Sequence, residues 1–146
     1  MNGTLLQALP ANVRPLGPAE RARFRERLRE ALHHEDPTLE GILLLGYANV
    51  TWASGFDHSP SERPIGLYVP RDTTPCLFVP RLEQEHAETV EGVTLETYDE
   101  FPGEHHPTLW MLERIAQRPE RPTRWAVDQL DGRLWATAIA SGRTLP

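Results

Sequence analysis

The sequence predicts an α/β domain in which helices flank a mixed β-sheet. Three observations lead to this prediction: apolar residues recur at helical spacing in several segments, short β-rich runs stand between those segments, and 14 prolines divide the 146 residues into short elements. Because helices and strands alternate and one pair of strands forms a hairpin, the sheet is expected to contain both parallel and antiparallel neighbours.

The first firm element is an amphipathic helix over residues 18–34, preceded by a segment, 1–17, that shows no sustained period and is expected to be an N-terminal extension. The apolar residues of this helix recur at helical spacing: Phe24, Leu28, Ala31 and Leu32. Five arginines interleave with glutamates along it, namely Arg21, Arg23, Arg25, Arg27 and Arg29. This charge pattern predicts a solvated face rather than a nucleic-acid-binding one.

Residues 42–45 form a continuous apolar run between two glycines, which predicts a central strand buried on both faces. Residues 47–56 predict a short helix or turn that ends at Gly55, and the polar segment 57–64, with two prolines, predicts a loop. The β-rich runs 65–69 and 76–79 predict a hairpin.

The second half of the chain continues the alternation, with helices expected at 81–90, 107–117 and 131–140 and strands at 93–98 and 125–127. Pro80 suits the first helix because a missing N–H has no cost at a helix start. The last helix is expected to bury the apolar residues Leu134, Trp135, Ala138 and Ile139.

Composition excludes several classes of function. Acidic residues outnumber basic ones by 21 to 15, and the net charge of −6 argues against nucleic acid or an anionic membrane as the main partner. No apolar run reaches 18 residues, and the single cysteine favours a reducing compartment, so a cytoplasmic location is expected. Cys76 itself is expected to be a small core residue.

Candidate catalytic and metal-binding clusters are weak. The neighbours Asp57, His58 and Ser59 contain the residue types of a hydrolase triad, but adjacent side chains project in different directions and cannot relay a proton. Two clusters contain possible metal ligands, residues 33–36 and 104–106. For both clusters a structural role is favoured over metal binding. His33 and His34, for example, fall at a helix C-terminus, where the exposed carbonyls attract such side chains. His86 is expected to form a solvent-facing pair with Glu83.

Several strings, in order, resemble one family. Residues 49–56 read Asn-Val-Thr-Trp-Ala-Ser-Gly-Phe, similar to the Asn-x-x-Tyr-Leu-Ser/Thr-Gly-Phe of the creatinase and prolidase family, the Xaa-Pro peptidases. The hairpin leading into residues 79–83 and the stretch 126–128 followed by 134–136 match as well. Residues 18–146 therefore resemble the N-terminal domain of that family, with Trp52 and Ala53 departing from its usual Tyr and Leu.

The resemblance implies a ribonuclease-H-like sheet that precedes a larger catalytic domain of the same protein, in which two divalent metal ions act on the peptide bond before proline. It assigns no catalytic residue and no metal ligand to this chain, which is expected to be part of a longer enzyme and inactive alone. It also implies a homodimer in which the loop 57–64 reaches the partner's pocket. His58, Glu62 and Arg63 are the polar side chains suited to meet a proline-containing peptide there, with Arg63 suited to a carboxylate.

Two alternatives remain open from the sequence. The first is a stand-alone protein-binding module on the same fold, which would present an exposed apolar patch. The second is an independent small-molecule-binding α/β domain, which would hold a ligand in the region 47–64. Dipeptidase and aminopeptidase activities of the parent enzyme are not distinguished by these residues.

Overall fold

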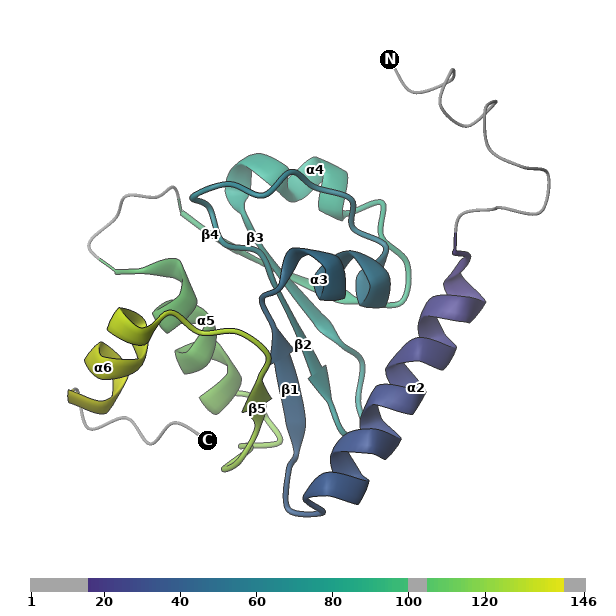
Figure 1. The fold of residues 1–146 in the computed structure, drawn as a ribbon. Helices are drawn as coiled ribbons and strands as arrows, with labels where there is room; N and C mark the ends of the chain where they lie inside the picture. Colours follow the sequence, from purple (N-terminus) through teal and green to yellow (C-terminus); the bar gives the residue numbers. More distant parts are fainter. Residues whose placement is uncertain (1–15, 100–104, 141–146) are drawn as a thin grey trace.

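A computed structural model of the chain describes residues 16–99 and 105–140 (Figure 1). The helices are α2 (Pro18–Glu35), α3 (Tyr47–Ser54), α4 (Gln84–Ala87), α5 (Pro107–Ala116) and α6 (Gly132–Ala140), with a 3₁₀ turn, η1 (Arg81–Glu83). The strands are β1 (Gly41–Leu44), β2 (Gly66–Pro70), β3 (Cys76–Pro80), β4 (Thr94–Tyr98) and β5 (Ala126–Val127). No helix among these residues has both the length and the apolar composition needed to span a bilayer.

The strands of the described residues form one mixed sheet in the order β4-β3-β2-β1-β5. β2 pairs antiparallel with both β1 and β3, whereas β5 runs parallel to β1 and β4 parallel to β3. The sheet therefore combines a hairpin with helical crossovers, and the mixed sheet flanked by helices that the sequence predicts is confirmed.

The sheet separates two apolar cores (Figure 1). Helices α2, α3 and α4 cover one face, where Val50 and Phe56 are fully buried against alternate strand residues such as Leu67. Helices α5 and α6 cover the other face, where Met111 and Ile115 are fully buried. Successive strand residues point to opposite faces, so each strand contributes to both cores. All four residues of β1 are buried, as expected for a central strand.

Two expectations about the helices are wrong. The segment 81–90 is not one continuous α-helix: η1 and the four-residue α4 are followed by i to i−3 hydrogen bonds from Thr89 and Val90. Only Ala87 of this segment is fully buried, with Val90 partly buried against the core, so little packing supports a longer helix. On α6, Trp135 and Ile139 are exposed by 42% and 54%, and only Ala138 of the expected apolar residues is fully buried. Ala31 of α2 is also exposed, on the solvent side of its helix.

The charged face of α2 is a further correction. Arg25 is buried, and its guanidinium donates to the carbonyl of Ala53 at the C-terminal end of α3 over 2.6 Å. One turn further, Arg29 donates to the carbonyls of Pro70 and Thr73, both at 2.8 Å. Because residues four apart share a helix face, these arginines form a stripe that attaches α2 to its neighbours. The solvated interpretation holds for Arg23 and Arg27, which are exposed.

Candidate functional site

The carboxyl ends of β1 and β5 form the natural place for a site. The two strands are parallel neighbours, and the chain leaves β1 for α3 on one face and β5 for α6 on the other (Figure 1). Where neighbouring parallel strands continue to opposite faces, a crevice opens outside their carboxyl ends, and ligands of α/β proteins commonly bind there.

Asp128 lies at this point, directly after β5. Its carboxylate accepts hydrogen bonds from the backbone N–H of Leu45 at 2.7 Å and of Gly46 at 3.1 Å, and from the side-chain amide of Asn49 at 2.9 Å. Gly46 is the N-cap of α3 and has no side chain of its own to cap the helix. Asp128 therefore holds the backbone that leads from β1 into α3, and its negative charge lies at the N-terminal end of that helix.

The loop 57–64 borders this crevice, and aromatic rings hold His58 in place. Its ring stacks on Phe56 with centroids 5.5 Å apart and meets the edge of Tyr47 at 5.0 Å. The Nδ1 atom is 3.3 Å from the Phe56 carbonyl. His58 is therefore partly buried in a fixed orientation, and Asp57 accepts a hydrogen bond from the Tyr47 hydroxyl at 3.5 Å.

Arg63 and Glu62 lie at the other end of the loop. The backbone N–H of Arg63 donates to the hydroxyl of Ser61, and its guanidinium is 3.6 Å from the Glu62 carboxylate. The Arg63 side chain is 32% exposed and that of Glu62 is 66% exposed. Tyr98 fixes the end of the loop, because its hydroxyl donates to the carbonyl of Pro64 at 2.7 Å.

Beside the loop lies a cleft of about 460 Å³. Its polar lining residues come from the loop, from the start of α5 and from the segment before α6: Ser61, Glu62, His106, Thr108, Gln129 and Asp131. Of the residues predicted from the sequence, Glu62 lines this cleft, whereas His58 and Arg63 are not among its walls. The sequence indicates His106 only as a possible metal ligand and gives no signal for Thr108, Gln129 or Asp131, because only the tertiary structure brings these residues to the loop.

The possible metal ligands in the sequence serve local structure. His106 is the N-cap of α5: its Nδ1 accepts from the backbone N–H of Thr108 at 3.2 Å, and burial lowers the pKa of this imidazole. The Nε2 atom of His105 lies 3.0 Å from the carboxylate of Glu113 on α5. Glu104 lies outside the described residues, and within those residues no group of three His, Cys, Asp or Glu side chains could hold a metal ion.

The remaining singled-out residues behave largely as expected. His33 and His34 stand in the last turn of α2, and burial raises the pKa of the Cys76 thiol in the core. His86 pairs with Glu83 at 3.6 Å, although its ring also lies 4.6 Å from that of Phe56. A raised thiol pKa disfavours the reactive thiolate, which agrees with a structural cysteine.

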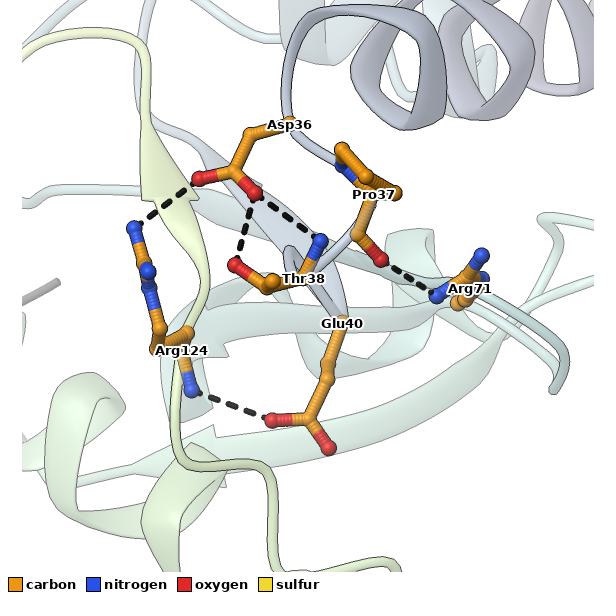
Figure 2. A network of polar contacts seen from close by, with 6 residues as sticks. All are labelled: Asp36, Pro37, Thr38, Glu40, Arg71 and Arg124. Atoms are coloured by element: carbon orange, nitrogen blue, oxygen red, sulfur yellow. Dashed lines mark hydrogen bonds and ion pairs between the residues drawn. The ribbon is translucent and has the colours of Figure 1, made fainter.

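A dense polar network at the opposite end of β1 also proves structural (Figure 2). Asp36 accepts from both the N–H and the hydroxyl of Thr38 and pairs with Arg124 at 2.9 Å. Glu40 accepts from the N–H of Arg124 at 3.1 Å, while Arg71 donates to the carbonyl of Pro37. These bonds connect the end of α2, the start of β1 and the start of β5.

The fold and the site together define an α/β domain with a loop-bordered cleft at the carboxyl ends of two parallel strands. Its family follows from the sequence comparison: the model of the creatinase/prolidase N-terminal domain matches residues 25–131. The chain belongs to that family. The sequence matches none of the curated proteins with which it was compared.

Solved structures share the fold. The creatinase/prolidase N-terminal domain of an X-Pro dipeptidase from Streptococcus pyogenes superposes with a TM-score of 0.61 at 22% identity, covering 85% of this chain and 92% of that one. The dipeptidase PepE from Mycobacterium ulcerans gives 0.62 at 19% identity, covering 89% of this chain. A prolidase from Thermococcus sibiricus gives 0.64 at 18% identity, also covering 89%. This chain spans 34% and 35% of the last two.

Proposed function

We propose that this chain is the non-catalytic N-terminal domain of a metal-dependent Xaa-Pro dipeptidase or aminopeptidase, and that it supports dimerisation and shapes the substrate pocket of the partner subunit. The family match over residues 25–131 carries this proposal. It is supported by the names of the similar structures, which include a dipeptidase and a prolidase of about three times the length of the matched region. The catalytic domain of the same protein is then the first partner of this chain.

In this proposal two divalent metal ions belong to the catalytic domain. The described residues offer no cluster that fits them, so no step of hydrolysis is assigned to this part of the chain. A cytoplasmic location is proposed on the ground of the single cysteine, which is free and buried.

The loop 57–64 is the part of the domain proposed to meet a proline-containing peptide in the partner subunit's pocket. His58 is fixed by two aromatic rings, and the loop end is fixed through Pro64, so the loop needs little ordering before it binds. Arg63 carries a planar guanidinium that matches a peptide carboxylate. Its side chain is about one third exposed, at 32%, and one guanidinium nitrogen lies 3.6 Å from the Glu62 carboxylate.

The parent enzyme is tested by isolating the natural protein. A tag placed at its N-terminus in the source cell should recover a polypeptide much heavier than 16.6 kDa that hydrolyses a Xaa-Pro dipeptide and loses this activity with a chelator. Recovery of a 16.6 kDa polypeptide bound to an unrelated protein, with no peptidase activity, would instead support the protein-binding module and refute the enzyme.

The role of Arg63 is tested in the same natural protein. Arg63→Met should raise KM about tenfold for a peptide with a free carboxyl terminus and leave KM for its C-terminal amide unchanged, because only the former offers a carboxylate. Arg27→Met, which removes the same charge from an exposed position on α2, should alter neither value. An equal effect of Arg63→Met on both peptides would contradict carboxylate recognition.

A further inference from the structure

Helix α6 presents an apolar face to solvent. Trp135 and Ile139 lie one turn apart on this helix and are exposed by 42% and 54%. The neighbouring pair, Leu134 and Ala138, packs against the core on the α5 side of the sheet. Because residues four apart share a helix face, α6 carries two apolar stripes side by side, and this domain covers only one of them. The outer face of α6 consists of the exposed residues Trp135, Ala136, Thr137, Ile139 and Ala140.

The outer face of α6 lacks the charge that a solvated helix carries. No charged residue occurs from 134 to 140. The hydroxyl of Thr137 already donates to the Arg133 carbonyl at 2.9 Å, so covering this face leaves no polar side chain unsatisfied. By contrast, α2 exposes Arg23, Glu26 and Arg27 on its solvent side. A helix that is apolar all round is typical of a buried helix, so the composition of α6 indicates a partner.

The helix is held in place while this face is exposed. Asp131 caps its N-terminus: the carboxylate accepts from the backbone N–H of Arg133 at 2.8 Å, and the carbonyl accepts from that of Trp135 at 3.0 Å. The inner stripe attaches the rest of the helix to the core. The outer face is therefore presented in a fixed orientation, and a partner has little to order on binding it.

The size of the outer face argues for a partner in the same polypeptide. Nine residues of α-helix are about 14 Å long, and the outer half of a cylinder about 10 Å wide has an area on the order of 200 Å². A stable complex of two free proteins buries about 800 Å² on each partner. A domain that is joined to this one by the chain has an effective concentration of roughly millimolar, so a contact of this size is sufficient.

The position of α6 in the chain indicates which domain this is. The family model matches residues 25–131, and α6 begins at Gly132, directly after the matched domain. The similar dipeptidase and prolidase are much longer, since this chain spans 34% and 35% of them. We propose that the outer face of α6 packs against an apolar surface of the catalytic domain of the same polypeptide. This inference rests on the proposed function, which supplies that domain.

Hydroxyl-radical footprinting tests the contact by comparing the natural protein with the 146-residue chain, and mass spectrometry measures the oxidation of each tryptophan. Trp135 should be oxidised about fivefold or more slowly in the natural protein, because full coverage takes it from 42% exposure to that of a core side chain. Trp52 is the internal control. It is 54% exposed on α3, on the opposite face of the sheet (Figure 1), and its oxidation should change by less than about twofold.

A charge placed on the outer face separates this contact from a general change in the protein. Ile139→Glu should return the oxidation of Trp135 in the natural protein to within about twofold of that in the 146-residue chain, because an unpaired carboxylate is costly to bury. In the 146-residue chain the same variant should keep the circular dichroism spectrum, since Ile139 is exposed there. Ala31→Glu adds the same charge at an exposed position on α2 and should leave Trp135 protected.

A photo-cross-linking variant, Ile139→p-benzoylphenylalanine, identifies the occupant. Irradiation of the natural protein should join this position to a peptide from the catalytic domain while the mass on a denaturing gel stays that of one polypeptide. A cross-linked product with the mass of two polypeptides, or of one polypeptide and another protein, would overturn the inference, because the face is then covered by a second copy or by a separate partner.

The outcomes also distinguish this inference from the proposed function. If the natural protein hydrolyses a Xaa-Pro dipeptide but oxidises Trp135 as fast as the 146-residue chain does, the proposed function stands and the inference is wrong. Equal protection of Trp52 and Trp135 contradicts it too, since coverage is then not specific to α6. A natural protein of only 16.6 kDa would refute the proposed function, and the inference with it.

Discussion

Arg25 provides the sharpest test of how α2 is attached. Arg25→Met keeps the length of the side chain and removes the donor to the Ala53 carbonyl, a buried contact of 2.6 Å. A hydrogen bond from a charged donor contributes about 1.5–3 kcal/mol. Part of this free energy is offset by the cost of placing a charge there. Burial lowers the pKa of Arg25, and the charges of Arg29 and Arg21 lower it further, so the charged form is disfavoured at this position. We expect a net loss of about 1–2 kcal/mol.

Urea unfolding, monitored by circular dichroism, measures this loss of stability. The same loss corresponds to a Tm lower by about 3–8 °C for a chain of this size. Arg27→Met is the matched control, because Arg27 is exposed on the same helix, and it should change stability by less than about 0.5 kcal/mol. If Arg25→Met is as stable as the unmodified chain, the guanidinium does not attach α2 to α3 and the interpretation of the arginine stripe is wrong.

Three further predictions concern local structure. Asp128→Ala should destabilise the chain by about 1–2 kcal/mol in urea unfolding, whereas Asp128→Asn, which keeps an acceptor, should cost less. Gly55→Ala should cost about 1–2 kcal/mol, since Gly55 has φ of 83° and a Cβ there would lie 2.6 Å from Arg21. The pKa of His106 is lowered in the fold. The folding free energy that the neutral imidazole contributes is therefore present above about pH 6.5 and is lost as pH falls through the lowered value. The unfolding free energy should therefore drop between pH 7 and 5.5, and the drop should shrink in His106→Asn.

The sequence predicts the elements of this fold well because local patterns determine them. The run 42–45 is apolar without interruption, and β1 is buried on both faces. Helix α6 shows the limit of this reasoning. Its periodicity correctly predicts an amphipathic helix, but a stripe of apolar residues does not reveal which neighbour covers it, and Trp135 and Ile139 remain exposed. The arginines of α2 have the same limit, since Arg25 and Arg27 look alike in the sequence and only the packing of α3 separates them.

Only part of the candidate site could be predicted from the sequence. Prolines and polar residues predict the loop 57–64, and its place after α3 follows from the chain order. The cleft beside it depends on residues such as His106 and Asp131, which lie more than 40 positions further along. The approach of Asp131 to Glu62 depends on β5 pairing with β1, a long-range event with no local signal.

Several residues of the string 49–56, which carries the family resemblance, hold the fold together. Asn49 binds Asp128, although 79 positions separate them, so two of the strings that carry the resemblance meet in one hydrogen bond. Gly55 supplies the left-handed turn that ends α3, and Phe56 is fully buried. Asn49, Gly55 and Phe56 thus serve a hydrogen bond, a turn and the core, whereas Trp52 of the same string is 54% exposed. Variants that alter recognition without altering stability should therefore come from the loop that follows, at His58 and Arg63, rather than from Asn49, Gly55 or Phe56.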